Sequence, residues 1–240
     1  MSKILKGFAL ALSMLTTLPF FKVHDFYKGI NGYSVMFYPL VGALLGLMLY
    51  GVSLLLDPYL PHFHLGVILF ALWVVLTGAL HLDGFADTVD GLFVSKERSL
   101  EVMKDPHNGG MGMLFGATFL LLKASSLVAC TDYLLLPLVL LLSRLMVVIA
   151  IYAYPYISGG MGSLLKEELT FRELLVALLY SLVFVFLYKG WFLLLGSFVV
   201  LWIIKNFFIK RYGGFTGDIY GFTIEVIELF LLNLIIVGLV

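Results

Sequence analysis

Long apolar segments separated by short polar ones dominate the chain. Seven of them approach or exceed the roughly 20 residues that a helix needs to cross a bilayer. These segments are 33–56, 64–82, 113–131, 134–154, 173–188, 191–209 and 220–240. A shorter apolar segment at 4–19 could span the membrane, re-enter it or lie in its interface.

Lipid offers the backbone no hydrogen-bond partners, so each apolar segment must satisfy its own N–H and C=O groups as a helix. The pattern therefore predicts an all-α, polytopic membrane protein with about seven to eight transmembrane or re-entrant helices. No internal repeat, low-complexity tract or long linker interrupts it, which predicts one transmembrane domain over 1–240.

Composition agrees with a membrane protein and excludes several other classes. Of the 240 residues, 62% are hydrophobic and only 12% are charged, whereas soluble domains are about half apolar and a quarter charged. The formal net charge is zero, so no basic excess indicates a nucleic-acid partner. The single cysteine, Cys130, excludes an internal disulfide framework and a cysteine-based metal site.

Basic residues are concentrated in alternate connections between the apolar segments. The turn at 132–133 and the connection 57–63 carry no Lys or Arg, and the turn near 189–190 carries only Lys189. The basic connections are 20–32, 83–112, 155–172 and 205–219. Because basic connections stay in the cytoplasm, we expect a multi-pass protein of the inner (plasma) membrane. Lys3 and Lys6 disagree with this orientation if segment 4–19 spans.

Four polar or glycine-rich clusters fall on the side predicted to be cytoplasmic, each at the end of a hydrophobic segment. They read "HLDGFADTVDG" (81–91), "KDPHNGGMG" (104–112), "SGGMGSLLKEE" (158–168) and "GGFTGDIYG" (213–221). Four such clusters at one face predict an active site that faces the cytoplasm.

The first cluster places three aspartates, Asp83, Asp87 and Asp90, on one face of a helix. Like charges at these spacings repel one another, and a bound cation would remove that cost. Magnesium prefers carboxylate oxygens and completes its shell with waters and substrate phosphates. The alternative is that the three aspartates only end a helix in water.

The second and fourth clusters repeat this chemistry. Asp105 precedes a proline and a flexible glycine run, while Thr216, Gly217 and Asp218 form a short polar loop before an apolar segment. Backbone amides in such loops can hold phosphate oxygens. His81 and His107 could bind phosphate or tune a proton transfer, although each could equally be an ordinary polar residue.

Two glutamates, Glu225 and Glu228, lie inside the last apolar segment. They need partners if they face the protein interior. Lys123 and Arg144 each stand alone in an apolar segment and are the expected partners, unless one or more of the four only extends to the membrane surface.

Several stretches of the chain resemble the cobalamin synthase family, whose members are adenosylcobinamide-GDP ribazoletransferases. The resemblance rests on "GALHLDGFADTVDGLF", "MKDPHNGGMG" and "GGFTGDIYGFTIEVIELFLL". It extends to "LTTLPFF" and "FYPLVGALLG" near the N-terminus and to "LSRLMVVIAIYAYPYISGGMG". These segments are collinear with the family and cover most of the chain.

The resemblance implies that a ribose hydroxyl of α-ribazole, or of its 5′-phosphate, attacks the corrinoid-linked phosphorus of adenosylcobinamide-GDP and that GMP leaves. It implies Mg²⁺ as cofactor, with Asp83, Asp87 and Asp105 as ligands and Asp90 as the base or a further ligand. Asp218 would complete this site or bind ribose hydroxyls. Phosphate oxygens would be held by Thr216 and by adjoining amides such as that of Gly217, with His81 and His107 as further substrate-binding candidates.

The implied partners are the corrinoid nucleotide, α-ribazole and membrane lipid, with no nucleic acid. The sequence leaves open whether copies of the chain form a homo-oligomer.

Two other functions remain open at this stage. A phosphotransferase of the CDP-alcohol type uses similar metal chemistry, but it typically shows D-x-x-D-G-x-x-A-R, whereas this chain has D-x-x-x-D-x-x-D without the arginine. A divalent-cation transporter would place its carboxylates near the bilayer midplane, whereas these aspartates lie at helix ends.

Overall fold

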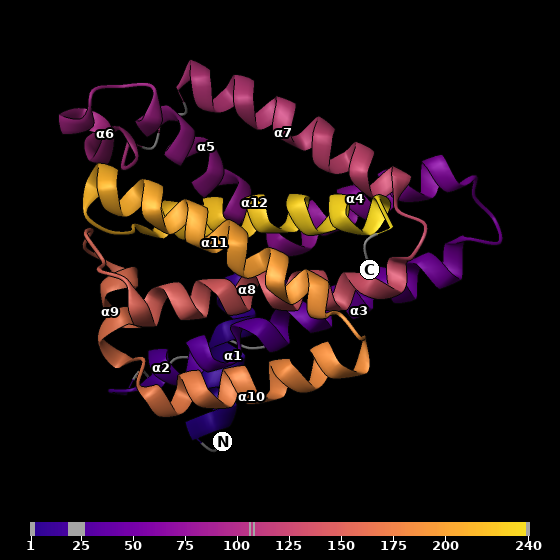
Figure 1. Cartoon of the computed structure of the whole chain (residues 1–240), viewed down its shortest axis with the longest axis horizontal. Helices are drawn as coiled ribbons and strands as arrows, with labels where there is room; N and C mark the ends of the chain where they lie inside the picture. The colour runs from indigo at the N-terminus through magenta and orange to yellow at the C-terminus, as the bar shows by residue number, and fades with distance from the viewer. Residues whose placement is uncertain (1–2, 19–26, 106, 108, 239–240) are drawn as a thin grey trace.

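The computed structural model describes residues 3–18, 27–105, 107 and 109–238. Within these residues the chain forms twelve α-helices and one short 3₁₀ helix, and no strand. The all-α fold expected from the sequence is confirmed. The long helices run roughly side by side, with α8 at their centre (Figure 1).

The helices follow one another along the described residues. Their bounds are α1 Lys3–Leu15, α2 Ile30–Met36, α3 Tyr38–Leu56, α4 His62–Thr77, α5 Leu80–Leu92, α6 Lys96–Val102, α7 Gly110–Ala129, η1 Tyr133–Leu135, α8 Leu136–Ala153, α9 Met161–Glu168, α10 Phe171–Leu187, α11 Trp191–Tyr212 and α12 Gly217–Ile236.

Helix α8 forms the core, since 15 of its 18 residues are buried. Glycines let a neighbouring helix approach it closely: a Cβ on Gly42 or Gly46 of α3 would collide with the backbone of Leu140 or Pro137 of α8. Small residues of this kind allow helix backbones to pack tightly inside a membrane, where burial of apolar surface supplies little driving force.

The expected continuous span 64–82 is wrong, because the helix ends at Thr77. Gly78 and Ala79 both adopt the left-handed conformation (φ 60° and 56°). Their amides bond back to the carbonyl oxygens of Val75 and Val74 at 3.1 Å each, in the manner of a Schellman cap. The chain then turns by 84° into α5, so the acidic residues lie on a separate helix.

Five helical segments are long and apolar enough to cross a membrane, and two bent pairs, α4–α5 and α9–α10, bring the number to seven among the described residues. This agrees with the lower end of the expected range. Helix α1 has 13 residues, or about 20 Å of length at 1.5 Å per residue, which is too short to cross the roughly 30 Å hydrocarbon core alone. Parts of the expected segments 4–19 and 220–240, and of connection 20–32, lie outside the described residues.

The polar connections gather at one end of the bundle. Helices α6 and α9 and the turn between α11 and α12 lie at the left edge of Figure 1, while the α3–α4 connection lies at the right edge. This arrangement places basic connections together and away from 57–63, as the alternation of Lys and Arg predicts.

Cysteine labelling tests the expected orientation. In a Cys130→Ala background, a membrane-impermeant maleimide should label Arg98→Cys and Leu164→Cys only from the cytoplasmic side, and Tyr59→Cys only from outside. All three native side chains are exposed, so access depends on the side of the membrane rather than on burial. Labelling of Tyr59→Cys from the cytoplasm would contradict this orientation.

Candidate active site

The three aspartates of α5 lie on one helix but in three different environments. Asp83 is exposed, Asp87 is half-buried and Asp90 is buried. The shared face expected from their spacing therefore runs from open solvent at Asp83 into packed protein at Asp90.

Helix α12 crosses α5 at a pair of glycines. A Cβ on Gly84 would lie 3.0 Å from the carbonyl oxygen of Asp218, and a Cβ on Gly221 would lie 3.1 Å from that of His81. This close approach brings Asp218, at the start of α12, to the acidic face of α5. Asp87 lies within electrostatic range of Asp83, Asp90 and Asp218.

One basic side chain also reaches this group of carboxylates. Lys104, at the end of the short α6 region, lies within electrostatic range of Asp218. Its ammonium group could contact a bound phosphate, a role that the sequence pattern did not indicate.

Asp90 anchors the start of α7. One of its carboxylate oxygens accepts the amide of Gly109 and the other accepts the amide of Gly112, both at 2.7 Å. A Cβ at either glycine would collide with this carboxylate. Both oxygens are thus engaged by backbone, a role the sequence analysis missed because it depends on a contact between separate segments. The assignment of Asp90 as base stays a prediction.

Asp105 and His107 pair with each other on the exposed loop before α7. The His107 ring and backbone amide contact one Asp105 oxygen at 2.8 and 3.0 Å. These hydrogen bonds hold the pKa of the Asp105 carboxyl below its ordinary value. Across the described part of the chain, no three His, Cys, Asp or Glu side chains lie close enough to hold a metal ion by themselves.

The segment just before the third cluster is joined to the fourth cluster through its backbone. The amide of Phe215 donates to the carbonyl of Pro155 at 2.9 Å, and the amide of Ile157 donates to that of Phe215 at 3.0 Å. Thr216 then begins α12, because its hydroxyl accepts the amide of Ile219 at 3.2 Å. The first, second and fourth clusters are therefore linked by direct contacts, and Met161 and Gly162 of the third line the same cavity as Asp83 and Asp218.

The C-terminal end of α5 is held in place by side chains of α11. Arg211 donates to the carbonyl oxygens of Leu92 and Val94 at 3.2 and 3.3 Å, and the Tyr212 hydroxyl donates to that of Gly91 at 3.3 Å. A basic side chain at a helix C-terminus satisfies carbonyls that have no partner within the helix. From the sequence, Arg211 was only one of the charges of the basic connection 205–219.

A cavity of about 280 Å³ lies behind the acidic rim. Asp83, Asp218, His81 and Tyr220 line this cavity, and its other walls are mostly apolar. The further lining residues come from α1, α3, α5, α8, α9 and α12: Met14, Leu15, Tyr38, Leu80, Gly84, Val147, Ile151, Met161, Gly162, Leu165, Gly217, Gly221 and Ile224.

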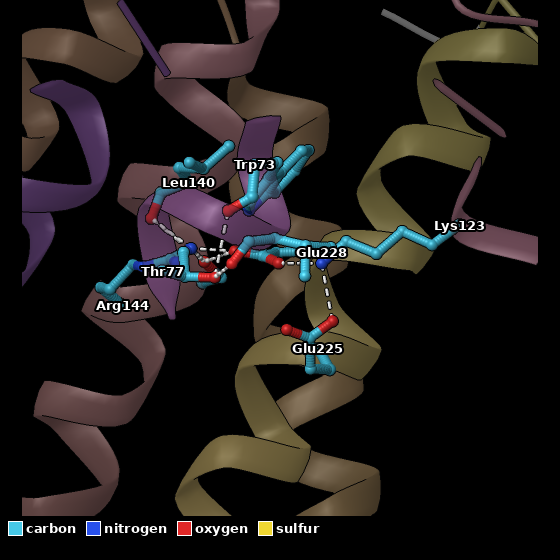
Figure 2. Close-up of polar contacts among 9 residues, drawn as sticks. Trp73, Thr77, Lys123, Leu140, Arg144, Glu225 and Glu228 are labelled. Atoms are coloured by element: carbon cyan, nitrogen blue, oxygen red, sulfur yellow. Dashed lines mark hydrogen bonds and ion pairs between the residues drawn. The ribbon is translucent and has the colours of Figure 1, made fainter. Parts of the chain in front are cut away.

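The expected pairing of the lone intramembrane charges is confirmed. Lys123 of α7 bonds Glu225 and Glu228 of α12 at 2.6 and 2.5 Å and lies over the Trp73 ring, while Arg144 of α8 pairs with Glu228. All four charged side chains are buried. Figure 2 shows the four charged side chains converging on one another, and all are buried, so none of the four extends to the membrane surface.

The geometry suits chemistry on a phosphate group. Carboxylates from α5 and α12 face a common space, glycines let a substrate approach the backbone closely, and the start of α12 presents helix amides that favour anions. Carboxylates would repel a phosphate on their own, so a cation between the two fits this set of residues.

Comparison with known proteins identifies the family. The sequence model described as cobalamin-5-phosphate synthase matches residues 7–236. The adenosylcobinamide-GDP ribazoletransferase of Desulforamulus reducens is 36% identical over 95% of this chain and 95% of its own. Proteins of the same name from Pseudomonas putida strain GB-1 (37% identical over 92% of this chain and 95% of its own) and Acinetobacter baumannii (35% identical over 96% and 97%) are similarly close.

No solved structure matches the chain. The family model and the relatives all extend across nearly the whole sequence and include each of the four polar clusters. The chain therefore belongs to the cobalamin-5-phosphate synthase family.

Proposed function

We propose that this protein is a membrane-bound adenosylcobinamide-GDP ribazoletransferase, which joins α-ribazole or its 5′-phosphate to the activated corrinoid in the last steps of cobalamin synthesis. The observation that carries the proposal is the meeting of the α5 carboxylates with Asp218 across the Gly84–Gly221 contact. The family match supports this reading over a lipid synthase of the CDP-alcohol type and over a cation transporter.

The reaction exchanges one phosphorus–oxygen bond for another. A ribose hydroxyl oxygen of the α-ribazole compound bonds to the corrinoid-linked phosphorus, and the bond from that phosphorus to the GMP oxygen breaks. The hydroxyl proton passes to a base, and GMP leaves with the bonding electrons. The protein must hold the diphosphate, stabilise charge on the leaving phosphate and accept the proton.

The carboxylates of Asp83, Asp87 and Asp218 are the residues that would hold Mg²⁺, with Asp105 as a further ligand from the neighbouring loop. Magnesium bound there would neutralise charge on the diphosphate. The described residues do not form a complete set of ligands by themselves, which agrees with an ion that takes substrate phosphates and waters as its remaining ligands.

The start of α12 would hold phosphate oxygens. Thr216 fixes this end of the helix as its N-cap, which leaves the exposed Gly217 at the first turn. Amides at a helix N-terminus bind anions, and Lys104 supplies a positive charge nearby. His107, exposed on the loop before α7, is a further candidate for a phosphate contact.

Asp90 is better placed to position the Asp105 loop than to act as a free base. One of its oxygens accepts the amide of Gly109 at the end of that loop and the other accepts the amide of Gly112 in the first turn of α7, and the side chain of Asn can accept only one of them. We expect Asp90→Asn to lower kcat about 10²–10⁴-fold, the range also found for loss of a general base, and to raise the Mg²⁺ concentration that activity requires.

The Mg²⁺ dependence separates the two roles of Asp90. Loss of a base alone should leave it unchanged, because a base acts mainly in the transition state. Asp105→Asn is the matched control and should raise the Mg²⁺ requirement without loss of the anchor. If Asp90→Asn lowers kcat with an unchanged Mg²⁺ requirement, Asp90 is the base.

The proposed function is tested with detergent-solubilised protein, adenosylcobinamide-GDP, α-ribazole and Mg²⁺. GMP and a cobalamin product should appear together in equal amounts. Release of GMP without a cobalamin product, or no turnover of the corrinoid nucleotide, would contradict the proposal, and turnover of a CDP-alcohol substrate would favour the lipid synthase.

A further inference from the structure

The cavity behind the acidic rim contains polar groups that the reaction scheme does not use. Both ring nitrogens of His81 and the hydroxyl of Tyr220 are buried and have no hydrogen-bond partner among the described residues. His81 is 4% exposed and Tyr220 is 6% exposed. Buried polar groups without partners are rare and costly, so these side chains indicate a ligand that supplies the partner.

The two ends of the cavity differ in character. Asp83 is exposed and Asp218 is half-buried, while His81 is buried and lies within electrostatic range of Lys123 and Arg144 in the buried charged network. The remaining walls are mostly apolar and include Val147, Ile151 and Ile224. A fitting ligand would therefore be apolar over most of its surface, polar at its inner tip, and reactive at the end beside the carboxylates.

We infer that this cavity binds the base of α-ribazole, with His81 donating a hydrogen bond to the imine nitrogen of the base and the ribose lying at the rim beside Asp83 and Asp218. The inference rests on the proposed function and adds the place where the acceptor nucleoside binds. The base is a planar dimethylbenzimidazole, which is apolar apart from one free imine nitrogen. It therefore matches a mostly apolar cavity in which His81 can act as the hydrogen-bond donor.

The other two large parts of the substrates fit less well. A cavity of about 280 Å³ is slightly below the roughly 300–1,000 Å³ of sites for drug-sized ligands, so it can take a bicyclic base but not a corrin ring. Guanine has donors and acceptors around most of its edge, and the apolar walls would leave several of them unpaired at considerable cost. With its base inserted, α-ribazole would point its ribose hydroxyls toward the diphosphate.

Substitution of His81 tests the contact. His81→Leu keeps a similar volume and removes both ring nitrogens, so the KM for α-ribazole should rise about 10-fold while the KM for adenosylcobinamide-GDP stays unchanged. His81→Gln restores a donor and should recover part of this loss. The wild type and His81→Leu should have similar KM values for the α-riboside of dimethylindole, which has carbon in place of the imine nitrogen. His64→Leu, an exposed histidine at the far end of α4, is the matched control.

Filling the cavity is an independent test that leaves its polar groups in place. Ile224→Phe should raise the KM for α-ribazole at least about 10-fold by occupying the space of the base, and binding of adenosylcobinamide-GDP should persist. An unchanged KM for α-ribazole in both His81→Leu and Ile224→Phe would overturn the inference, as would a rise confined to the corrinoid nucleotide, which would assign the cavity to guanine. A wild-type protein that releases no GMP would instead refute the proposed function.

Discussion

Asp83→Asn and Asp87→Asn should each reduce GMP release by at least about 10²–10³-fold, as loss of a single electrostatic contact to a transition state does. Asp87 lies within electrostatic range of Asp83 and Asp218, and each substitution removes one formal charge from the proposed Mg²⁺–diphosphate site. Initial rates at saturating substrate, measured over a range of Mg²⁺ concentrations, would test this. Near-normal turnover in both variants would contradict the metal assignment.

The same substitutions should leave the protein folded, so that a loss of activity would reflect the site and not unfolding. Asp83 is exposed and Asp87 is half-buried, and removal of one of several like charges relieves repulsion rather than breaking a contact. Thermal midpoints in detergent should therefore be unchanged or slightly raised. Asp57→Asn, an exposed carboxylate in the connection between α3 and α4, is the matched control and should affect neither activity nor stability.

The sequence predicted what depends on composition and on local spacing. The helical segments follow from the length of apolar runs, because lipid leaves the backbone no alternative. The pairing of Lys123 and Arg144 with Glu225 and Glu228 was also predictable, since isolated charges in apolar segments must find one another.

Features that depend on backbone geometry or on contacts between distant segments were not predictable. The break at Gly78 is hidden in an apolar run, and only the left-handed conformation of Gly78 and Ala79 reveals it. Asp90 looked equivalent to Asp83 and Asp87 by spacing, yet it is the one that the packed loop before α7 buries. Such differences arise when the fold assigns three similar side chains to three different neighbours.

The role of His81 could not be predicted from the sequence either. The sequence indicated only that it could bind phosphate, tune a proton transfer or be an ordinary polar residue. The structure places it in a cavity without a partner, and that observation gives it a role. A glycine contact between α5 and α12, far apart in sequence, brings Asp218 to the acidic rim of this cavity.

The buried charged network has a structural consequence for the site, because α12 contributes to both. Asp218 lies in the first turn of α12, and Glu225 and Glu228 lie two and three turns further along. Their pairs with Lys123 and Arg144 fix the rotation and height of α12 against α7 and α8. The network therefore also determines where Asp218 stands relative to the α5 carboxylates.

Glu228→Gln should destabilise the protein more than any substitution at the acidic rim. The network contains two positive and two negative side chains, and among the described residues Glu228 is the carboxylate that pairs with Arg144 as well as Lys123. Its loss leaves a buried guanidinium without its ion-pair partner, and breaking a buried pair costs about 3–5 kcal/mol. The thermal midpoint in detergent should fall by about 10 °C or more, and GMP release should fall with it.

A charge-balanced double variant distinguishes loss of a counter-charge from loss of packing. Lys123→Met with Glu225→Gln removes one charge of each sign and keeps the Arg144–Glu228 pair, so it should be more stable than Glu228→Gln although it changes two buried residues. Replacing a complete buried pair is often nearly neutral, whereas breaking one is not. If the double variant unfolds as readily as Glu228→Gln, packing at this interface matters more than charge balance. If Glu228→Gln keeps the wild-type midpoint, the network does not hold α12 in place.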